Sequence, residues 1–282
     1  MPTTTATTAV KLSNVQETLL LPLWGRAVEA KKAHPLLLDT AAVRIIHSID
    51  YDFSTIAANI SCITQLSWIA RSLHIDEIVR QFTHGADAAT IVNLGCGLDT
   101  TFERVDDGRL LWYDLDLPDV IELRANFIEE GPRRKFIAGS ILDEEWMGRL
   151  ASGRSILFIA AGVLYYFEEQ QVKTLMRRLA DRFPGSEFAF DACSPRGVKM
   201  ANKKVIEGGG MDENARLIWG INRAAEIHEW DPRITVLAEY PIVHGMRSGL
   251  SLKEKWGTLL TDTLRVMSMV HLRMGNKVEA GH

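Results

Sequence analysis

Two glycines and two aspartates are the residues whose types and spacing best predict chemistry. The segment NLGCGLDT, residues 93–100, directly follows a β-branched stretch that is typical of a strand. Glycine has no Cβ, so at Gly95 and Gly97 the backbone can turn sharply and approach a ligand closely. The pattern predicts a cofactor-binding loop that also includes Asn93 and Asp99.

An acidic strand end follows this loop. The next apolar stretch closes with YDLD, residues 113–116, and Asp116 follows Gly97 at roughly the 20-residue spacing at which an acid meets ribose hydroxyls in nucleotide-binding folds. A carboxylate can accept two hydroxyl hydrogen bonds, and charge-assisted bonds are stronger than neutral ones. We expect Asp116 to bind a ribose, with Asp114 as the second choice.

The loop differs from the dinucleotide fingerprint, because Thr100 stands where the third glycine would be. A pyrophosphate needs the closely packed helix N-terminus that this glycine allows, whereas a cofactor with one adenosine and an amino-acid arm does not. The departure favours S-adenosylmethionine over NAD. A plain tight turn, with the aspartates capping the next helix, is the alternative, but the preceding strand and the acid at the expected interval favour a cofactor site.

The elements that would position these residues alternate between strands and helices. Five apolar runs read as parallel strands, and their unbroken apolar character is typical of strands covered on both faces. Helices are expected before them, between them and after them. The expected strands are TIVNL, LLWYDLD, KFIAG, SILFIAAG and EFAFDAC, with two more at 233–240 and 266–273; the expected helices are 13–24, 41–82, 119–129, 144–150, 168–183, a helix that ends at the glycines 208–210, and 251–263.

This order predicts an α/β fold with a doubly wound, mostly parallel, seven-stranded sheet of the Rossmann-like, class I methyltransferase type. An N-terminal helical segment and a helical insertion on the substrate side complete it. We expect a flexible tail at 1–12 and one domain at 13–282. Within that domain, 13–85 would form a helical lid, 86–195 the cofactor-binding core, and 196–282 a substrate cap with the last strands.

Composition excludes several classes of protein. Hydrophobic residues make up 46% and charged residues 24% of the chain, which indicates a folded protein. The formal net charge is −4 without a long basic run, which argues against nucleic acid as a partner. No apolar stretch approaches the roughly 20 residues of a membrane span, and the start does not resemble a secretory signal. The three cysteines lack metal-ligand spacing, so we expect a cytoplasmic protein without a metal site.

Five segments give the chain a family resemblance over roughly residues 56–240. The most specific are VNLGCGLDTTFERV (92–105) and YDLDLPDVIELR (113–124), since ordinary class I methyltransferases seldom carry both. The others are AGVLYYF (161–167), RFPGSEFAFDACSP (182–195) and WGINRAAEIHEWDP (219–232). The chain resembles the leucine carboxyl methyltransferase family, and within it the bacterial polyketide O-methyltransferase branch of the tetracenomycin type.

The resemblance implies S-adenosylmethionine as the methyl donor and assigns cofactor roles by motif. Arg71 matches the arginine that clasps the cofactor's methionine carboxylate, a group that suits the guanidinium fork. Gly95 matches the glycine under the amino-acid arm, and Asp116 the ribose-binding acid. Ser140 and Ile141 match the residues around adenine. Ala161, before Gly162, departs from the family, which usually has a glutamate there near the cofactor's ammonium.

The resemblance also implies a small-molecule methyl acceptor, with a carboxyl or phenolic oxygen on an aromatic, polyketide-like product. A carboxylate needs no general base, whereas a phenol would need one, and His228 is the first candidate. Aromatic and apolar side chains are expected to wall a pocket for a flat acceptor. Those residues are Tyr165, Tyr166, Met211, Trp219 and Trp230.

Two alternatives remain open at this point. A nicotinamide-dependent oxidoreductase would use the same loop, although the third glycine and a recognisable hydride-transfer pair are missing. A cofactor-binding protein that has lost catalysis is the other, because Ala161 replaces the family's acid. The oligomeric state is open as well, and a homodimer is considered.

Overall fold

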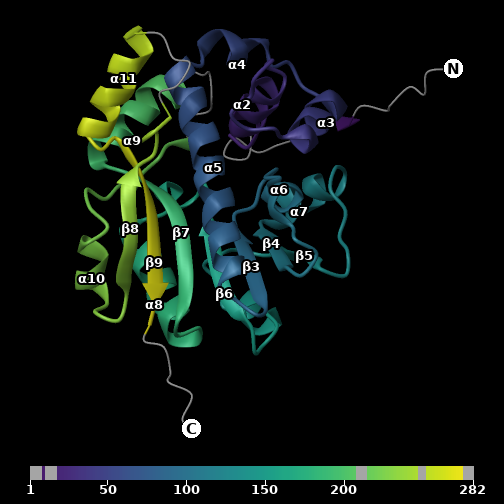
Figure 1. Cartoon of the computed structure of the whole chain (residues 1–282), viewed down its shortest axis with the longest axis vertical. Coiled ribbons are helices and arrows are strands. Elements are labelled where there is room, and N and C mark those ends of the chain that lie inside the picture. The colour runs from purple at the N-terminus through teal and green to yellow at the C-terminus, as the bar shows by residue number, and fades with distance from the viewer. Residues whose placement is uncertain (1–7, 10–17, 208–214, 247–251, 276–282) are drawn as a thin grey trace, which may run out of the picture.

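The computed structural model describes residues 8–9, 18–207, 215–246 and 252–275 (Figure 1). Its centre is a seven-stranded sheet. The strands are β3 (Ala89–Leu94), β4 (Leu111–Asp116), β5 (Arg134–Ala138), β6 (Ser155–Ala160), β7 (Ser186–Cys193), β8 (Thr235–Pro241) and β9 (Met267–Met274). Their order is β5-β4-β3-β6-β7-β9-β8, and β9 runs antiparallel to both of its neighbours while the β5-to-β7 strands are parallel. The expected doubly wound, mostly parallel, seven-stranded sheet is confirmed.

Helices connect the strands and form the N-terminal part of the chain. A two-residue pair of strands, β1 (Thr8–Ala9) and β2 (Ile49–Asp50), lies apart from the main sheet. The helices are α2 (Leu20–Ala30), α3 (Thr40–Ser48), α4 (Ser54–Asn59), α5 (Cys62–His84), α6 (Thr101–Val105), α7 (Pro118–Ala125), α8 (Glu169–Arg182), α9 (Pro195–Ala201), α10 (Glu226–Trp230) and α11 (Leu252–Thr263); η1 (Glu145–Arg149) and η2 (Leu164–Tyr166) are 3-10 turns, and η3 (Asn202–Glu207) is a π-helix.

The helical segment expected over 41–82 is divided into three helices, α3, α4 and α5. The chain is extended at Ile49, which pairs with Thr8, and a new helix starts after Ser61. The Ser61 hydroxyl accepts a hydrogen bond from the Thr64 N–H at 3.2 Å, which is the usual way in which serine begins a helix. Apolar residues continue across these breaks because α3, α4 and α5 all contribute side chains to the core, so the pattern alone does not reveal the breaks.

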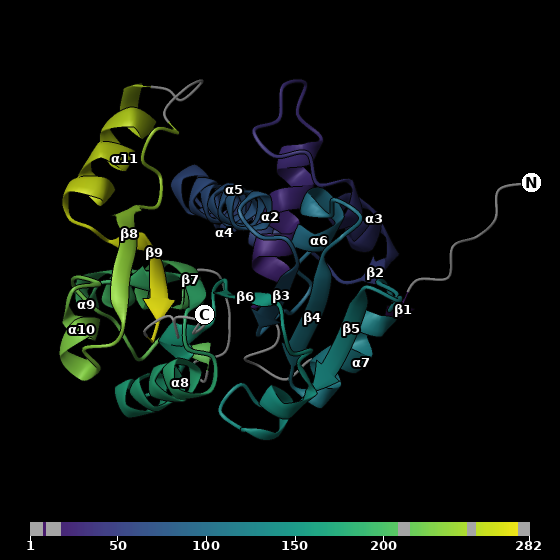
Figure 2. The ribbon, with the colours of Figure 1, turned by 60° about the horizontal axis from the view of Figure 1, so that its bottom comes forward.

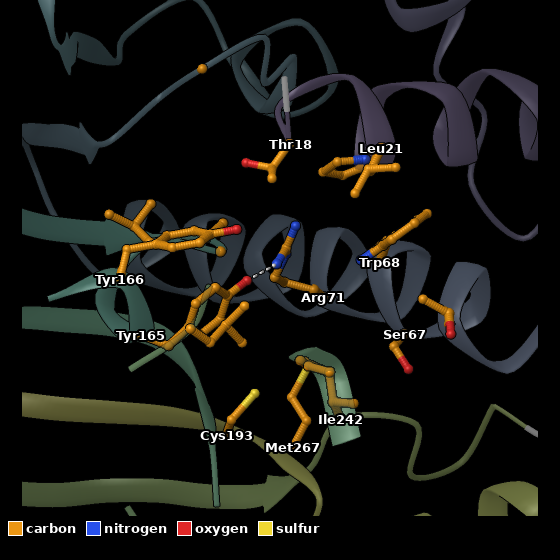
Figure 3. A pocket seen from close by; sticks show the side chains of 18 of the residues that line it. Thr18, Leu21, Ser67, Trp68, Arg71, Tyr165, Tyr166, Cys193, Ile242 and Met267 are labelled. Atoms are coloured by element: carbon orange, nitrogen blue, oxygen red, sulfur yellow. Dashed lines mark hydrogen bonds between the residues drawn. The ribbon is translucent and has the colours of Figure 1, made fainter. Parts of the chain in front are cut away.

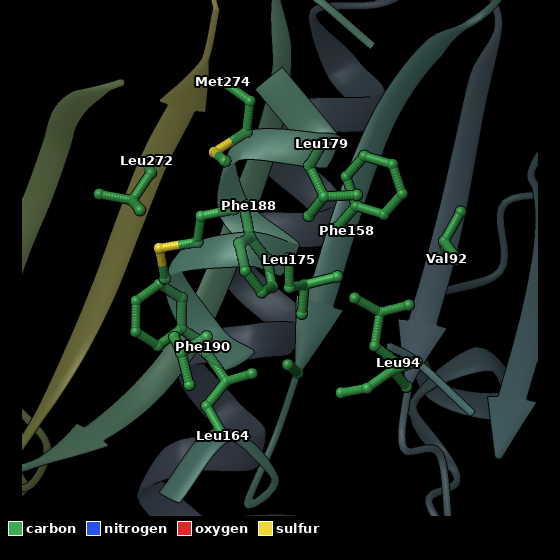
Figure 4. Packing of buried hydrophobic residues seen from close by; sticks show 14 of the residues in the cluster. Val92, Leu94, Phe158, Leu164, Leu175, Leu179, Phe188, Phe190, Leu272 and Met274 are labelled. Carbon is green, nitrogen blue, oxygen red and sulfur yellow. The ribbon is translucent and has the colours of Figure 1, made fainter. Parts of the chain in front are cut away.

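Alternate residues of each strand face two different helical layers. Ile91 packs against Ile75 and Val79 of α5, whereas Val92 faces the side covered by α8. Figure 2 shows α5 and α8 on opposite sides of the sheet, and Figure 4 shows the α8 side. The α8 stripe expected from the sequence is confirmed, with Val172, Leu175, Met176 and Leu179 all buried. Two-sided cover explains why the strands are apolar throughout.

One ionic cluster is buried beneath the glycine loop. The Asp114 carboxylate, fully buried on β4, accepts hydrogen bonds from Arg124 Nη2 at 3.0 Å and Arg134 Nε at 2.8 Å. The side chains of Trp112 and Asn93 also donate to it, at 2.8 and 3.2 Å. Two arginines and two neutral donors therefore compensate this one charge, as burial requires.

None of the helices in the described part of the chain is long and apolar enough to cross a bilayer. Two expectations cannot be compared with the structure. The helix end at the glycines 208–210 lies outside the described residues, as does the tail at 1–12 apart from Thr8 and Ala9.

We predict that Asp114→Asn lowers the free energy of unfolding by about 3 to 5 kcal/mol, because it leaves two buried guanidinium groups without their shared counter-ion. Urea denaturation followed by circular dichroism measures the change. Asp107→Asn is the matched control: Asp107 pairs with Arg109 at the exposed surface, and its loss should change stability by about 1 kcal/mol or less. Equal effects of the two variants would contradict the prediction.

Candidate active site

The candidate site lies at the carboxyl ends of β3 and β6, the central pair of the sheet. From β3 the chain proceeds through β4 to β5 on one side, and β6 leads to β7 on the other. The loops that leave two such strands diverge and open a crevice, which is where doubly wound folds bind their ligands. Here the diverging segments are the glycine loop, residues 95–99, and the turn at 161–166.

The glycine loop adopts the conformation that its sequence predicts. Gly95 and Gly97 have φ angles of +67° and +47°, a region that side chains disfavour. A Cβ on Gly95 would lie 2.6 Å from a methyl group of Val163, and one on Gly97 would lie 2.8 Å from the Leu19 side chain. The loop therefore has no room for side chains at these two positions.

Hydrogen bonds hold the loop to three neighbouring elements. The Gly95 N–H donates to the Leu115 carbonyl at 2.8 Å, which ties the loop to β4. Arg124 Nη1 of α7 donates to the Gly97 carbonyl at 2.7 Å, and Arg26 Nη2 of α2 donates to the Leu98 carbonyl at 3.0 Å. The backbone beneath the crevice is thus fixed by two buried arginines.

Two carboxylates face the crevice from this loop and from the end of β4. Asp116 accepts from the Gly97 N–H at 2.7 Å and from the Leu117 N–H at 2.8 Å. Burial raises the pKa of Asp116, and these two N–H groups oppose the rise. Burial would also raise the pKa of Asp99, but Arg104, Arg26 and Arg124 outweigh it and lower the value to about 2. Asp99 is therefore ionised throughout the neutral range.

A cavity of about 510 Å³ begins at the glycine loop and extends beyond the strand ends. Its first part is lined from the ends of β3, β4 and β5 by Gly95 to Asp99, Asp116, Leu117, Gly139, Ser140 and Ile141. Its other part lies between α5, α9, the β8–β9 connection and α11. Lining residues there include Ile63, Ser67, Trp68, Met200, Lys204, Ile206, Leu217, Ile242, Val243, Leu260 and Met267.

Arg71 and Tyr165 lie between these two parts (Figure 3). Arg71 Nη1 donates to the Tyr165 hydroxyl at 3.4 Å and to the Asp191 carboxylate at 3.1 Å. Burial would lower the pKa of Arg71, but Asp191 and Tyr165 outweigh it and raise the pKa. Burial, reinforced by Asp191, raises the pKa of Tyr165 well above its usual value. The pair therefore remains an arginine cation beside a neutral phenol.

The structure brings most of the sequence-predicted residues to this one cavity. They come from five separate segments, which the sheet topology places side by side. Those that line it are Arg71, Gly95, Gly97, Asp99, Asp116, Ser140, Ile141, Ala161, Gly162, Tyr165 and Tyr166.

Asn93 and Asp114 do not line the cavity, which corrects their expected place in the site. Both are buried beneath it, where Asn93 Nδ2 donates to Asp99 and Asp114. Asp114 cannot serve as the second ribose acid, because Arg124 and Arg134 already take its carboxylate. Both residues support the loop from below instead.

The histidine and tryptophan predictions for the acceptor side are corrected as well. His228 is exposed on α10 and lies 3.1 Å from the Ile234 carbonyl through Nδ1, because its neighbour Ile227 turns into the core. Trp219 is buried in the α8-side core, where its ring lies 6.2 Å from that of Trp230. None of the three lines the cavity. Met211 lies outside the described residues.

The sequence analysis does not predict the residues that line the other part of the cavity, between α5, α9 and α11. Trp68 was hidden within a long helix, and Met200, Leu217 and Ile242 lie in segments with no motif. One signal was available: Trp68 precedes Arg71 by less than one helical turn, so both can face the same opening. Asp191, which pairs with Arg71, has no sequence signal beyond its place in the segment 182–195.

The chain was compared with known proteins. Residues 20–180 match the family model for leucine carboxyl methyltransferase. The chain belongs to the leucine carboxyl methyltransferase family. Enzymes of this family transfer a methyl group from S-adenosylmethionine, so the chain is an S-adenosylmethionine-dependent methyltransferase. The family resemblance and the cofactor expected from the sequence are confirmed, and the nicotinamide-dependent and inactive alternatives are wrong.

Two family relatives show how far the similarity extends. TcmP of Streptomyces glaucescens, an O-methyltransferase of tetracenomycin polyketide synthesis, is 29% identical over 252 residues, which cover 89% of this chain and 85% of TcmP. The S-adenosylmethionine-dependent methyltransferase dpfgK of Gibberella zeae is 31% identical over 202 residues, which cover 65% and 67% of the two chains.

A solved structure shows a similar fold. A DUF574 family protein from Streptomyces avermitilis aligns with a TM-score of 0.56 and 11% identity, over 92% of this chain and 95% of that one.

We predict that Asp116→Ala weakens the binding of S-adenosylhomocysteine by about 1.5 to 3 kcal/mol, the scale of hydrogen bonds to a charged group. Calorimetric titration measures the affinity, and circular dichroism verifies that the variant is folded. Asp119→Ala, three residues further along but not part of the cavity lining, is the control. Unchanged affinity in folded Asp116→Ala would remove Asp116 from the ribose site.

Proposed function

We propose that this methyltransferase esterifies the carboxylate of a small, apolar acid, aromatic or polyketide-like in character. The observation that carries the proposal is the lining of the acceptor side, the part of the cavity between α5, α9 and α11. It combines mostly apolar walls with Lys204, a cation without an ion-pair partner among the described residues. The O-methyltransferase activity and the polyketide context in the name of TcmP support an oxygen acceptor of this kind.

The glycine loop and its surroundings fit S-adenosylmethionine, which supplies the electrophilic methyl group when bound. Asp116 would accept from the ribose hydroxyls, and Ser140 and Ile141 would flank the adenine. The amino-acid arm would lie along the backbone of the glycine loop at Gly95, and Arg71 would bind its carboxylate through its guanidinium fork. These roles use residues that all line the same cavity.

Water exclusion would fall to the N-terminal segment. Thr18, Leu19 and Leu21 line the cavity from the start of α2, and the Leu19 side chain lies against Gly97. Methyl transfer from a sulfonium is an in-line displacement that depends on alignment in a site shielded from water. A covering segment held to the loop by Arg26 meets this requirement.

Apart from the carboxylates Asp99, Asp116 and Asp262, the tyrosine and cysteine side chains that line the cavity offer no general base for a phenol, which favours a carboxylate as acceptor. Among the described residues that line it, none is a histidine. Burial raises the pKa values of Tyr165, Tyr166 and Cys193, so each keeps its proton at neutral pH. A phenol, with a pKa of about 10, would need a base to react, whereas a carboxylate is already ionised. Tyr165 can instead donate its proton in a hydrogen bond to the acceptor.

Lys204 supports an acidic acceptor. Three cationic residues line the described part of the cavity: Arg26 pairs with Asp39, Arg71 pairs with Asp191, and Lys204 forms no ion pair among the described residues. An unpaired ammonium at the apolar end would attract a carboxylate without being neutralised by the protein.

We predict that an aromatic carboxylic acid with a phenol substituent is labelled at the carboxyl group when the cofactor carries a labelled methyl. Alkaline treatment separates the outcomes, because a methyl ester releases labelled methanol and an aryl methyl ether does not. The kcat/KM should be flat from about pH 6.5 to 8.5, since the acid is ionised over that range. An alkali-stable label, with a rate that rises about tenfold per pH unit, would identify phenol methylation instead.

We also predict that Lys204→Met raises the KM for the acidic acceptor by about five- to tenfold and leaves the KM for S-adenosylmethionine unchanged, because an exposed charge contributes about 1 kcal/mol. Lys203→Met is the matched control, since the neighbouring lysine is also exposed but does not line the cavity. Steady-state kinetics with both substrates varied measures the effect. If Lys204→Met and Lys203→Met have the same KM for the acidic acceptor, Lys204 does not bind the acceptor.

A further inference from the structure

Asp191 is a buried acid directly behind the cavity wall. It lies on β7 and is fully buried. Its Oδ2 accepts from Arg71 Nη1 at 3.1 Å, and its Oδ1 accepts from the Gly162 N–H at 2.6 Å. Both partners line the cavity, whereas Asp191 does not. One carboxylate therefore holds a cation of α5 and the backbone turn after β6 at the same time.

The way in which Arg71 is held leaves one edge of its guanidinium available. Its hydrogen bonds to Asp191 and Tyr165 both use Nη1. No described residue takes a hydrogen bond from Nε or Nη2, which share the opposite edge of the planar group. Two parallel N–H groups in this arrangement match the two oxygens of a carboxylate. The Arg71 side chain is thus oriented by the protein and still able to bind a ligand.

Gly162 completes this arrangement. Its φ of +83° places its Cα against the guanidinium, and a Cβ there would lie 2.6 Å from Arg71 Nη1. Because Asp191 accepts from the N–H of this same residue, it also fixes the turn that the guanidinium packs against. The adjacent Ala161 carries no charge, so the acid that balances Arg71 comes from the neighbouring strand.

We propose that Asp191 is a positioning residue, which orients Arg71 and the Gly162 turn so that the free Nε and Nη2 edge binds the carboxylate of the cofactor's methionine arm. The inference rests on the cofactor role proposed for Arg71. It predicts that Asp191 affects cofactor affinity through Arg71 alone, although it does not line the site itself.

A double-mutant cycle measured with S-adenosylhomocysteine tests this proposal. In Asp191→Asn the amide oxygen can still accept from Gly162, while the amide NH₂ faces the guanidinium and turns it away. We expect Asp191→Asn and Arg71→Gln each to raise the Kd by about tenfold or more, the scale of a charged hydrogen bond. Asp191→Asn should add less than about twofold in the Arg71→Gln background, because coupled residues are not additive. If Asp191→Asn raises the Kd by the same factor with and without Arg71→Gln, the proposal is overturned.

Two further variants keep the outcomes distinct. Glu187→Gln is the matched control, because Glu187 lies on the same strand and pairs with Arg273 at 3.3 Å, away from the cavity; its Kd should not change. Arg71→Lys keeps the charge that buried Asp191 needs but lacks the fork, so it gives a folded test if Asp191→Asn does not fold.

Two outcomes separate the two roles. An unchanged Kd in both Arg71 variants would refute the cofactor role of Arg71. A raised Kd in Arg71→Gln with an unchanged Kd in Asp191→Asn would refute only the positioning role of Asp191.

Discussion

The glycine loop is tied to the sheet by one buried guanidinium, that of Arg124. It is fully buried and joins the Asp114 carboxylate of β4 to the Gly97 carbonyl of the cofactor loop. A buried arginine must be neutralised and hydrogen-bonded, so the two groups that accept from Nη1 and Nη2 of Arg124 set its position. Here one of those groups belongs to the sheet and the other to the loop. The position of the glycine loop is therefore fixed relative to β4 beneath it.

Sheet order determines what gathers above that loop. Because β3 and β6 are neighbours, residues 95–99 and 161–166 face each other although more than 60 residues separate them in sequence. The Val163 side chain lies where a Cβ of Gly95 would be, so the two segments are in direct contact. Helix α5 then adds Arg71 from above the sheet. A cofactor bound at the first segment would have its reactive end close to the second, beside the acceptor side of the cavity.

The sequence predicts which residues line the part of the cavity at the glycine loop better than it predicts those of the other part, for a physical reason. The loop, Asp116 and the strand ends belong to a motif in which spacing follows from the length of one strand and one crossover, so local sequence determines their geometry. The acceptor wall has no such local rule. Leu217 lines it because Asn202 holds its backbone with two hydrogen bonds at 2.9 and 2.8 Å, a contact that no periodicity reveals.

The same reasoning explains the errors. His228 follows the fifth strand expected from the sequence, which makes it a candidate base, yet α10 buries Ile227 and so directs His228 outward. The helical spacing over 41–82 is present, but α4 ends at Asn59, before extended Ile60, and the Ser61 hydroxyl caps the start of α5. Caps and tertiary packing, rather than hydrophobic periodicity, decide such boundaries.

Pairing determines what each cation of the cavity can do. Arg26 is bound to Asp39 and to the Leu98 carbonyl, so its charge serves the loop. Arg71 uses only Nη1 for protein contacts and keeps one edge for a ligand carboxylate. Lys204 has no ionic partner in the described part of the chain. A neutralised charge attracts little, whereas an exposed ammonium attracts anions weakly but over a distance. The three cations therefore differ in what they can still bind: Arg26 has its charge and one N–H engaged by the protein, Arg71 keeps one edge, and Lys204 keeps its whole charge within the described part of the chain.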